Sequence, residues 1–486
     1  MNGQAGEEKQ TEKGEKVMEI NRRQFLKGMA TLVVGSQMPW ILESDVFAAV
    51  QTQTLNFRIT DAMKEMITHN SINDARCYFW IYKSDAPDLP ADCPGPNIFC
   101  TQGDTISITL TNELDEPHAF FIPGVFSSGP IAPAETKTFS FTASRAGSFL
   151  YYDNLNAPVN RVMGLHGAFI VMPRLAAPGH KFTPYDRPTP AVQRLFDDLG
   201  TAGHFPGLSW EAGDMANHTP PFRQYVWVLH QASPVLFAEV GSLPPGQIYP
   251  AAQFVNAMLN DPYANAFETG VMNRKAQYYT LNGQSGFFGH HNGYICPKLR
   301  VGEPCIVRVL NAGLYLHSMH MHANHMYVIS LNRRVQDNVL WVDTIQAVPL
   351  GGFDWLVPFH RPPDIPNTRG IGLPDPPLTT VNGGKTWPPE EELGTYFPPV
   401  GTLADPLNPN SVDISVQQSP LCYPMHDHCE PSQVAQGGNY NFGLMSGMDF
   451  IGDRTMEGGI VTFPNSSAEH GPDATGPAAG PDHAGH

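Results

Sequence analysis

The chain has 486 residues, of which 41% are hydrophobic and only 15% are charged. This composition is typical of a globular protein and excludes a coiled coil or a disordered chain. The 46 prolines and 45 glycines favour short strands joined by many turns. The net charge of −17 argues against nucleic acid as a partner, because the chain has no excess of cations to neutralise phosphates.

The N-terminal segment carries the pattern of an export signal. Residues 21–27, Asn-Arg-Arg-Gln-Phe-Leu-Lys, resemble the twin-arginine motif, and an apolar stretch follows from Gly28 to Leu42. Small residues precede a plausible cleavage position after Ala48. The apolar stretch is too short for a stable membrane span, and no other stretch approaches that length. We therefore expect residues 1–49 to be a signal region and the mature protein to be periplasmic or extracytoplasmic, without a membrane span.

Residues 50–174 have the pattern of a β-sandwich. Polar and apolar residues alternate in Thr105–Leu110, as in a half-buried strand, and Thr138–Phe141 and Gly167–Val171 behave similarly. Turn residues separate these short strands. The pattern predicts one β domain over this range.

A second β region is expected over residues 223–465. Residues 175–222 are rich in Pro, Gly and Ala and predict a linker or extended insert. An insert at about 360–410 is dense in Pro and Gly, and long excursions of this kind often cover a site. The tail, residues 466–486, has a composition typical of disorder. The predicted strands of this region are Tyr225–Leu229, Tyr278–Leu281, Cys305–Leu310, Met326–Ile329 and Trp341–Ile345.

The seven cysteines could form disulfides in an oxidising compartment. Cys93 and Cys100 flank a Pro-Gly-Pro turn, and Cys296 and Cys305 flank a probable strand turn. Either pair could be bridged, but the sequence does not determine which cysteines pair.

Two histidine strings are the strongest chemical signal in the chain. His320 and His322 form one His-x-His, and His426 and His428 form another, each on a predicted strand. Side chains alternate across a strand, so each pair shares one face. If the two strands pair, four imidazoles converge. Neutral imidazole is a good ligand for copper and zinc.

Several segments together resemble the multicopper oxidase family of cupredoxin-fold proteins. The resemblance covers roughly residues 55–465 outside the inserts and implies an all-β fold of tandem cupredoxin-like Greek-key β-sandwiches with long Pro/Gly-rich inserts. Two units are expected; a degenerate third unit at 174–290 is the alternative. The segments that carry the resemblance are Pro94–Pro96, Gly103–Thr105, Leu110–Pro117, Phe141–Gly147, Gly164–Val171, Leu281–Gly283, Val309–Gly313 and the His-x-x-His-x-His of His317, His320 and His322.

The resemblance also assigns metal roles, and many of them fail in this sequence. In the first β region the two expected His-x-His positions hold Phe121–Pro123 and Tyr152–Asn154. His118 lies three residues out of register and is expected to be an exposed loop histidine. In the second β region, Asp427 stands where the family has the cysteine of its type-1 copper site. A carboxylate cannot replace that thiolate electronically, so we expect no type-1 centre.

The remaining ligands keep the family pattern. The resemblance implies that His320, His322, His426 and His428 bind copper, and it makes His317 a further candidate. Asp427 could bind metal with His317 or accept hydrogen bonds from the backbone. His325, an odd step beyond His322, should face away, and His290 and His291 are expected to be polar loop residues.

We therefore expect an exported copper-binding protein, a possible oxidoreductase with a reduced copper site and an unidentified small-molecule substrate. A neighbouring subunit could complete the site in a homo-oligomer such as a trimer. Two alternatives remain open: a non-catalytic cupredoxin scaffold or interaction protein, and a copper storage or delivery protein.

Overall fold

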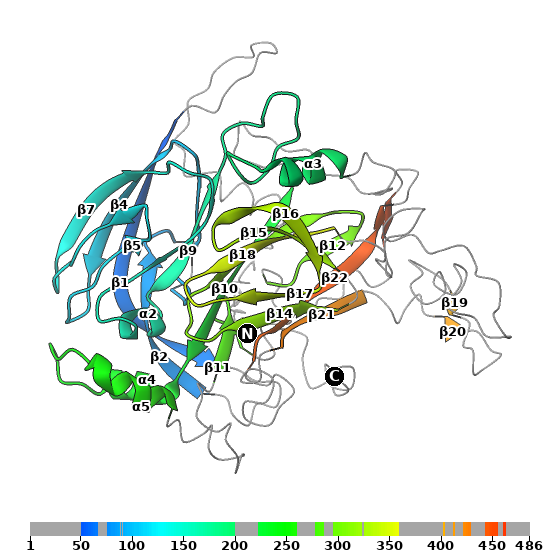
Figure 1. Cartoon of the computed structure of the whole chain (residues 1–486). Coiled ribbons are helices and arrows are strands. Elements are labelled where there is room, and N and C mark those ends of the chain that lie inside the picture. Colours follow the sequence, from blue (N-terminus) through cyan, green and yellow to red (C-terminus); the bar gives the residue numbers. More distant parts are fainter. Residues whose placement is uncertain are drawn as a thin grey trace, which may run out of the picture.

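The computed structural model describes residues 50–66, 75–87, 89, 91–199, 222–259, 278–285, 295–322, 325–358, 402–403, 412–413, 421–428, 443–454 and 460–462. Its regular structure is almost entirely β, which confirms the predicted fold class (Figure 1). The expected signal region, the tail, His290, His291 and the insert, apart from two of its residues, lie outside the described residues. No helix among the described residues is long and apolar enough to cross a membrane.

The first β region consists of two sheets that enclose one core. Their orders are β2-β1-β4-β7 and β3-β9-β8-β5-β6. Ile106 of one sheet and Phe169 of the other belong to the same buried cluster. The strands are β1 (Thr52–Met66), β2 (Ala75–Ser84), β3 (Ile98–Thr101), β4 (Thr105–Asn112), β5 (Phe121–Ile122), β6 (Phe126–Ser127), β7 (Thr136–Thr142), β8 (Gly147–Tyr152) and β9 (His166–Met172).

The second β region repeats this arrangement. Its two sheets have the orders β11-β10-β13-β18-β15-β16 and β12-β22-β21-β14-β17, and β23 pairs with β22. Val307 of β13 and Met319 of β14 share its core. The strands are β10 (Arg223–Ala232), β11 (Tyr278–Leu281), β12 (Lys298–Val301), β13 (Cys305–Asn311), β14 (His317–Met321), β15 (Met326–Leu331), β16 (Arg334–Val342), β17 (Thr344–Ala347), β18 (Gly352–Val357), β21 (Leu421–Asp427), β22 (Met445–Arg454) and β23 (Ile460–Thr462), with β19 (Thr402–Leu403) and β20 (Val412–Asp413) paired apart.

Local sequence patterns explain why these strands form. In β4 intermediate and buried residues alternate along the whole strand, as the alternation of polar and apolar residues predicts. The residues of β13 are buried throughout, as expected for a central strand covered on both faces. All the predicted strands named above coincide with or overlap observed ones.

Part of the segment expected as a linker is a helix, α3 (Pro190–Asp198). Thr189 caps it by accepting a hydrogen bond from Val192 N, and Pro190 occupies its first turn. Its apolar face is buried beside β16, so this segment joins the core. Figure 1 shows α3 above β16. The other short helices are α2 (Val159–Val162), α4 (Pro234–Gly241), η2 (Ala251–Gln253) and α5 (Phe254–Leu259).

The two β regions are packed directly against each other. A third buried cluster includes Ile170 of β9, Val228 of β10 and Phe196 of α3. Buried charge also crosses the junction: Asp354 accepts hydrogen bonds from Ser148 and Tyr185, each at 2.7 Å. These contacts join the two β regions and hold their residues in place relative to one another.

Candidate metal centre

The two strands that carry the histidine strings are neighbours, as predicted. Strands β14 and β21 pair in antiparallel fashion, with His320 directly opposite His426 and Met319 opposite Asp427. The backbone N–H of His428 continues the contact by donating to Ser318 O at 2.7 Å. The pairing therefore brings both His-x-His motifs onto one face of the sheet.

The four imidazoles form a compact group on that face. The ring centre of His320 lies 4.9 Å from that of His322, 5.3 Å from that of His426 and 4.6 Å from that of His428. Three of the residues, His320, His426 and His428, each place a ring nitrogen within 4.8 Å of the others. His322 Nε2 lies 2.7 Å from His426 Nε2. This group is called the four-histidine cluster below.

Neighbouring groups orient the rings of the cluster. Nδ1 of His320 donates a hydrogen bond to Thr344 Oγ1 at 2.8 Å, and Asp343 O lies 3.2 Å from the same nitrogen. Nδ1 of His426 lies 3.3 Å from the carbonyl of Asp427. With Nδ1 carrying the proton, Nε2 of His320 is left as an acceptor, which is the arrangement that ligating histidines have in metalloproteins.

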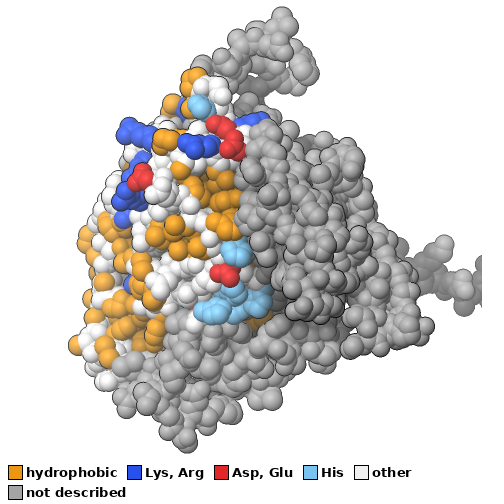
Figure 2. All heavy atoms as spheres, turned by 45° about the vertical axis from the view of Figure 1, so that its right-hand side comes forward, with side chains coloured by type: hydrophobic (Ala, Val, Ile, Leu, Met, Phe, Trp, Pro, Cys, Tyr) orange, Lys and Arg blue, Asp and Glu red, His pale blue; other side chains and the backbone are white. Residues whose placement is uncertain are grey.

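Burial favours the uncharged form of two of the four imidazoles. The pKa of His426 is lowered to about 4, mainly by burial and in smaller part by the neighbouring imidazoles, while the hydrogen bond to the Asp427 carbonyl opposes the shift. The pKa of His320 is lowered mainly by burial, while Asp343 opposes the shift. His428 is exposed and the other three are half-buried. Figure 2 shows histidine side chains gathered on the surface beside an acidic group.

His317 and Asp427 lie on the opposite face of the two strands, as the alternation of side chains predicts. Both side chains are fully buried, and Nδ1 of His317 lies 2.6 Å from Asp427 Oδ2. The second carboxylate oxygen accepts a hydrogen bond from Ser318 N at 2.6 Å. Nε2 of His317 faces Gln231 Nε2 at 2.5 Å. The structure thus places His317 outside the four-histidine cluster with both ring nitrogens engaged.

The expectation that His118 is an exposed loop histidine is wrong. Its side chain is completely buried, and its Nδ1 lies 2.7 Å from Asp153 Oδ2. Asp153 stands where the family pattern would have a histidine or cysteine string, and it is buried as well. The pairing was missed because the two residues lie on separate segments. Both β regions therefore hold a buried histidine–aspartate pair.

Glu116 beside this pair predicts a pH-dependent stability. Burial raises the pKa of Glu116 to about 7, with smaller raising effects from Asp115 and Asp153 and a lowering one from His118. A carboxyl group whose pKa is raised by folding favours the folded state most at pH values below the pKa that it has in the unfolded chain. This contribution to the free energy of unfolding is lost as the pH rises through about 7. Glu116→Gln should therefore stabilise the protein by about 1–2 kcal/mol at pH 8 and have almost no effect at pH 4.

Urea denaturation at the two pH values measures this difference. Glu113→Gln is the matched control, because Glu113 is exposed and pairs with Arg58. An equal effect of Glu116→Gln at both pH values would contradict the assignment.

A second group of side chains that could bind a metal ion lies outside the two histidine strings and was not predicted from the sequence. Cys93, His166 and His230 are all buried and place one ligand atom each within 4.8 Å of one another. They lie on three distant segments, so spacing gives no signal. Neither disulfide considered for the pairs Cys93–Cys100 and Cys296–Cys305 forms, since Cys93, Cys100 and Cys305 are free thiols.

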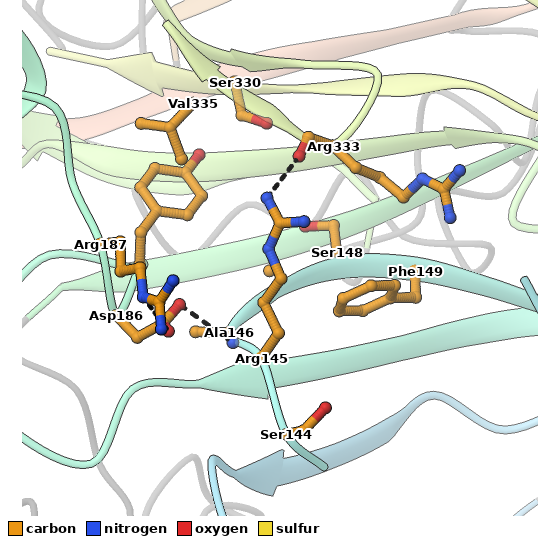
Figure 3. A pocket seen from close by; sticks show the side chains of 12 residues that line it. Ser144, Arg145, Ala146, Ser148, Phe149, Asp186, Arg187, Ser330, Arg333 and Val335 are labelled. Atoms are coloured by element: carbon orange, nitrogen blue, oxygen red, sulfur yellow. Dashed lines mark hydrogen bonds and ion pairs between the residues drawn. The ribbon is translucent and has the colours of Figure 1, made fainter. Parts of the chain in front are cut away.

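A cavity of about 390 Å³ opens where the two β regions meet. Arg145, Arg187 and Arg333 contribute to its lining together with Asp186 (Figure 3). The Arg145 guanidinium donates to Arg333 O at 3.1 Å. The lining includes no histidine, so this cavity is separate from the four-histidine cluster. The ring of His325 stacks on Trp341 at a 9° interplanar angle, and its charge contributes to lowering the pKa of His320.

Comparisons with known proteins show which part of the chain is similar to a known family. A family model described as multicopper oxidase matches residues 89–176. An L-ascorbate oxidase homolog of Nicotiana tabacum is 30% identical over 124 residues, which are 23% of this chain and 21% of the relative. L-ascorbate oxidase of Brassica rapa subsp. pekinensis is 29% identical over 131 residues, 22% of each chain. The chain thus spans about a fifth of the length of these curated relatives.

Solved structures with similarity include two copper proteins. The blue copper oxidase from Nitrosomonas europaea is 14% identical, with 82% of this chain and 86% of that chain covered and a TM-score of 0.48. The multicopper oxidase mgLAC is also 14% identical, with 83% and 86% covered and a TM-score of 0.46. The sequence similarity to multicopper oxidases thus lies in residues 89–176 for the family model and in about a fifth of the chain for the two curated relatives.

Proposed function

We propose that the protein is an exported copper-binding protein that acts as an oxidoreductase through a reduced copper site. The four-histidine cluster carries the proposal, because it gathers four imidazoles from two paired strands on an accessible face. The family resemblance favours copper over zinc, which the same ligands would also accept. The twin-arginine motif in residues 21–27 supports export to the periplasm or another extracytoplasmic space.

The cluster has dimensions that suit a metal ion. Two nitrogens held at right angles about 2.0 Å from one metal lie about 2.9 Å apart. The 2.7 Å between His322 Nε2 and His426 Nε2 would need to widen by only a few tenths of an ångström. Thr344 already fixes the ring of His320 with Nε2 available. The residues present therefore fit copper.

We propose no type-1 copper centre at His317 and Asp427. Asp427 supplies a carboxylate in place of a thiolate, and its two oxygens are engaged by His317 and Ser318 N. In the first β region, His118 and Asp153 engage each other in the same way. Full reduction of oxygen in the manner of the family is thus not proposed.

Bound copper would supply one-electron redox chemistry at the surface of the protein. The chain's own residues set the conditions for that chemistry. Burial holds the pKa of His426 low, so this imidazole is neutral and needs no deprotonation before it binds a metal. The exposed His428 leaves the cluster open to small molecules from solvent.

Equilibrium dialysis of the full-length chain against copper(II), followed by metal analysis and electron paramagnetic resonance, tests the proposal. We expect bound copper whose spectrum has hyperfine structure from several nitrogen ligands. A scaffold protein without a metal function would retain no stoichiometric copper with that signature, and such a result would refute the proposal.

Thr344→Val is expected to weaken copper binding at the cluster by about 10–100-fold, because the hydrogen bond that orients His320 is lost. Thr344 is only half-buried, so stability should change little. Competition titration with a chelator measures the affinity. Thr138→Val is the control, since Thr138 bonds only Thr109 on an exposed face; equal weakening by both variants would contradict a role in orienting the ligand.

A further inference from the structure

Three buried side chains at the junction of the two β regions are arranged like the ligands of a metal ion. Cys93 lies in the loop after β2, His166 begins β9 and His230 lies in β10 of the second region. Cys93 is 1% exposed, His166 0% and His230 1%. Sγ of Cys93 lies 3.8 Å from Nε2 of His166. The ring centres of His166 and His230 are 4.6 Å apart.

The backbone fixes both imidazoles so that one nitrogen of each is available. Nδ1 of His166 lies 3.0 Å from Arg161 O, and Nε2 of His230 lies 2.7 Å from Val162 O. These two carbonyls end the short helix α2, where intrahelical donors are missing. Each ring therefore donates one N–H to a carbonyl, as ligating histidines in metalloproteins do.

One nitrogen in this group has no partner. His230 Nδ1 is buried and makes no hydrogen bond among the described residues. With Nε2 donating to Val162 O, Nδ1 is a bare acceptor, and leaving a buried acceptor unsatisfied is unfavourable. A purely structural histidine would be expected to avoid this cost. A cation bound between the rings and the thiol removes it.

We propose that Cys93, His166 and His230 bind one copper ion through Sγ, Nε2 and Nδ1. A thiolate with two imidazoles in a trigonal arrangement is a ligand set that proteins use for copper. A metal about 2.3 Å from sulfur and about 2.0 Å from nitrogen, at trigonal angles, separates the two atoms by about 3.7 Å. Cys93 Sγ and His166 Nε2 lie 3.8 Å apart, which is close to that separation. On binding, the thiol gives up its proton to solvent and no electron is transferred.

The surroundings close the site on the side of Cys93. Gly164 lies against the sulfur at φ +121, and a side chain there would meet Trp80 O at 2.5 Å and Cys93 Sγ at 3.2 Å. The ligands come from both β regions, so the bound ion links them. The site uses none of the residues of the four-histidine cluster and stands independently of the proposed function.

The test uses the full-length chain with His320→Ala and His322→Ala, which disables the four-histidine cluster. After loading with copper, we expect one copper per chain and X-ray absorption that gives one sulfur and two nitrogen neighbours. Copper should also raise the unfolding temperature. Loss of all copper, uptake of zinc only, or nitrogen neighbours without sulfur would overturn the proposal, whether or not further variants fold.

Two cysteine variants in the same background assign the sulfur. Cys93→Ser should abolish copper retention and any visible thiolate-to-copper absorption. Cys100→Ser should preserve both, because Cys100 is a free thiol outside the group. Retention of the sulfur signal in Cys93→Ser would overturn the assignment. Failure of the four-histidine proposal is distinguishable, since it concerns only copper with nitrogen neighbours that His320→Ala and His322→Ala remove.

Discussion

Copper binding at the four-histidine cluster should fall by at least about 1,000-fold when His320 and His322 are both replaced by alanine. The loss of an outer partner of a ligand costs about 10–100-fold in affinity, and the loss of two ligands must cost more. His320 contributes most to this effect because its ring lies within 5.3 Å of the three other ring centres. Chelator competition, read from the nitrogen-bound copper signal in electron paramagnetic resonance, gives the affinity.

The control removes a histidine that the structure places elsewhere. His180 forms an exposed pair with Asp197. His180→Ala should therefore keep the nitrogen-bound copper. Equal loss in this variant and in the double variant would show that histidine content, rather than the paired strands, determines copper uptake.

The sequence predicted that the four imidazoles would converge if the two strands paired, and the structure pairs them. Each His-x-His fixes one face of its strand, because side chains alternate with a period of two. The register that places His320 opposite His426 then brings all four rings together. The same alternation correctly separated His317 and Asp427 from that face. Whether the cluster binds copper stays a prediction.

Contacts between distant segments could not be predicted in this way. His118 is buried, and its partner Asp153, 2.7 Å away, lies on another segment. Cys93, His166 and His230 lie on three segments, and two carbonyls of α2 orient the two imidazoles at the junction of the two regions. The helix α3 was hidden by the Pro- and Gly-rich composition around it, although Thr189 and Pro190 form a favourable start.

The two β regions also share a detail that composition does not reveal. Asn112 and Asn311 each end a strand and donate through the side-chain amide to two backbone carbonyls. In both regions a buried histidine–aspartate pair follows, at His118–Asp153 and His317–Asp427. His317 and Asp427 stand at positions where the family resemblance would place copper ligands, and Asp153 lies within a string where it would place such ligands, whereas His118 lies three residues out of register. We infer that buried hydrogen bonds, rather than a metal, hold these side chains together.

This interpretation predicts a large stabilising role for Asp427. Its two oxygens accept from His317 Nδ1 and Ser318 N, each at 2.6 Å, and both side chains are fully buried. Asp427→Ala leaves two buried donors without acceptors and should reduce the free energy of unfolding by about 3–5 kcal/mol. Asp427→Asn keeps one acceptor oxygen, so its loss should be smaller, about 1–3 kcal/mol.

Urea denaturation of the metal-free protein measures both variants. Asp197→Ala is the control, because it breaks a histidine–aspartate pair of similar length, 2.7 Å, that solvent reaches, where the expected cost is below about 1 kcal/mol. Asp427 also lies between His426 and His428 on the chain, so Asp427→Ala should weaken copper binding at the cluster by displacing β21 from β14. A variant that lost copper while keeping its full stability would instead mean that Asp427 acts on the metal directly, against the geometry of its two hydrogen bonds.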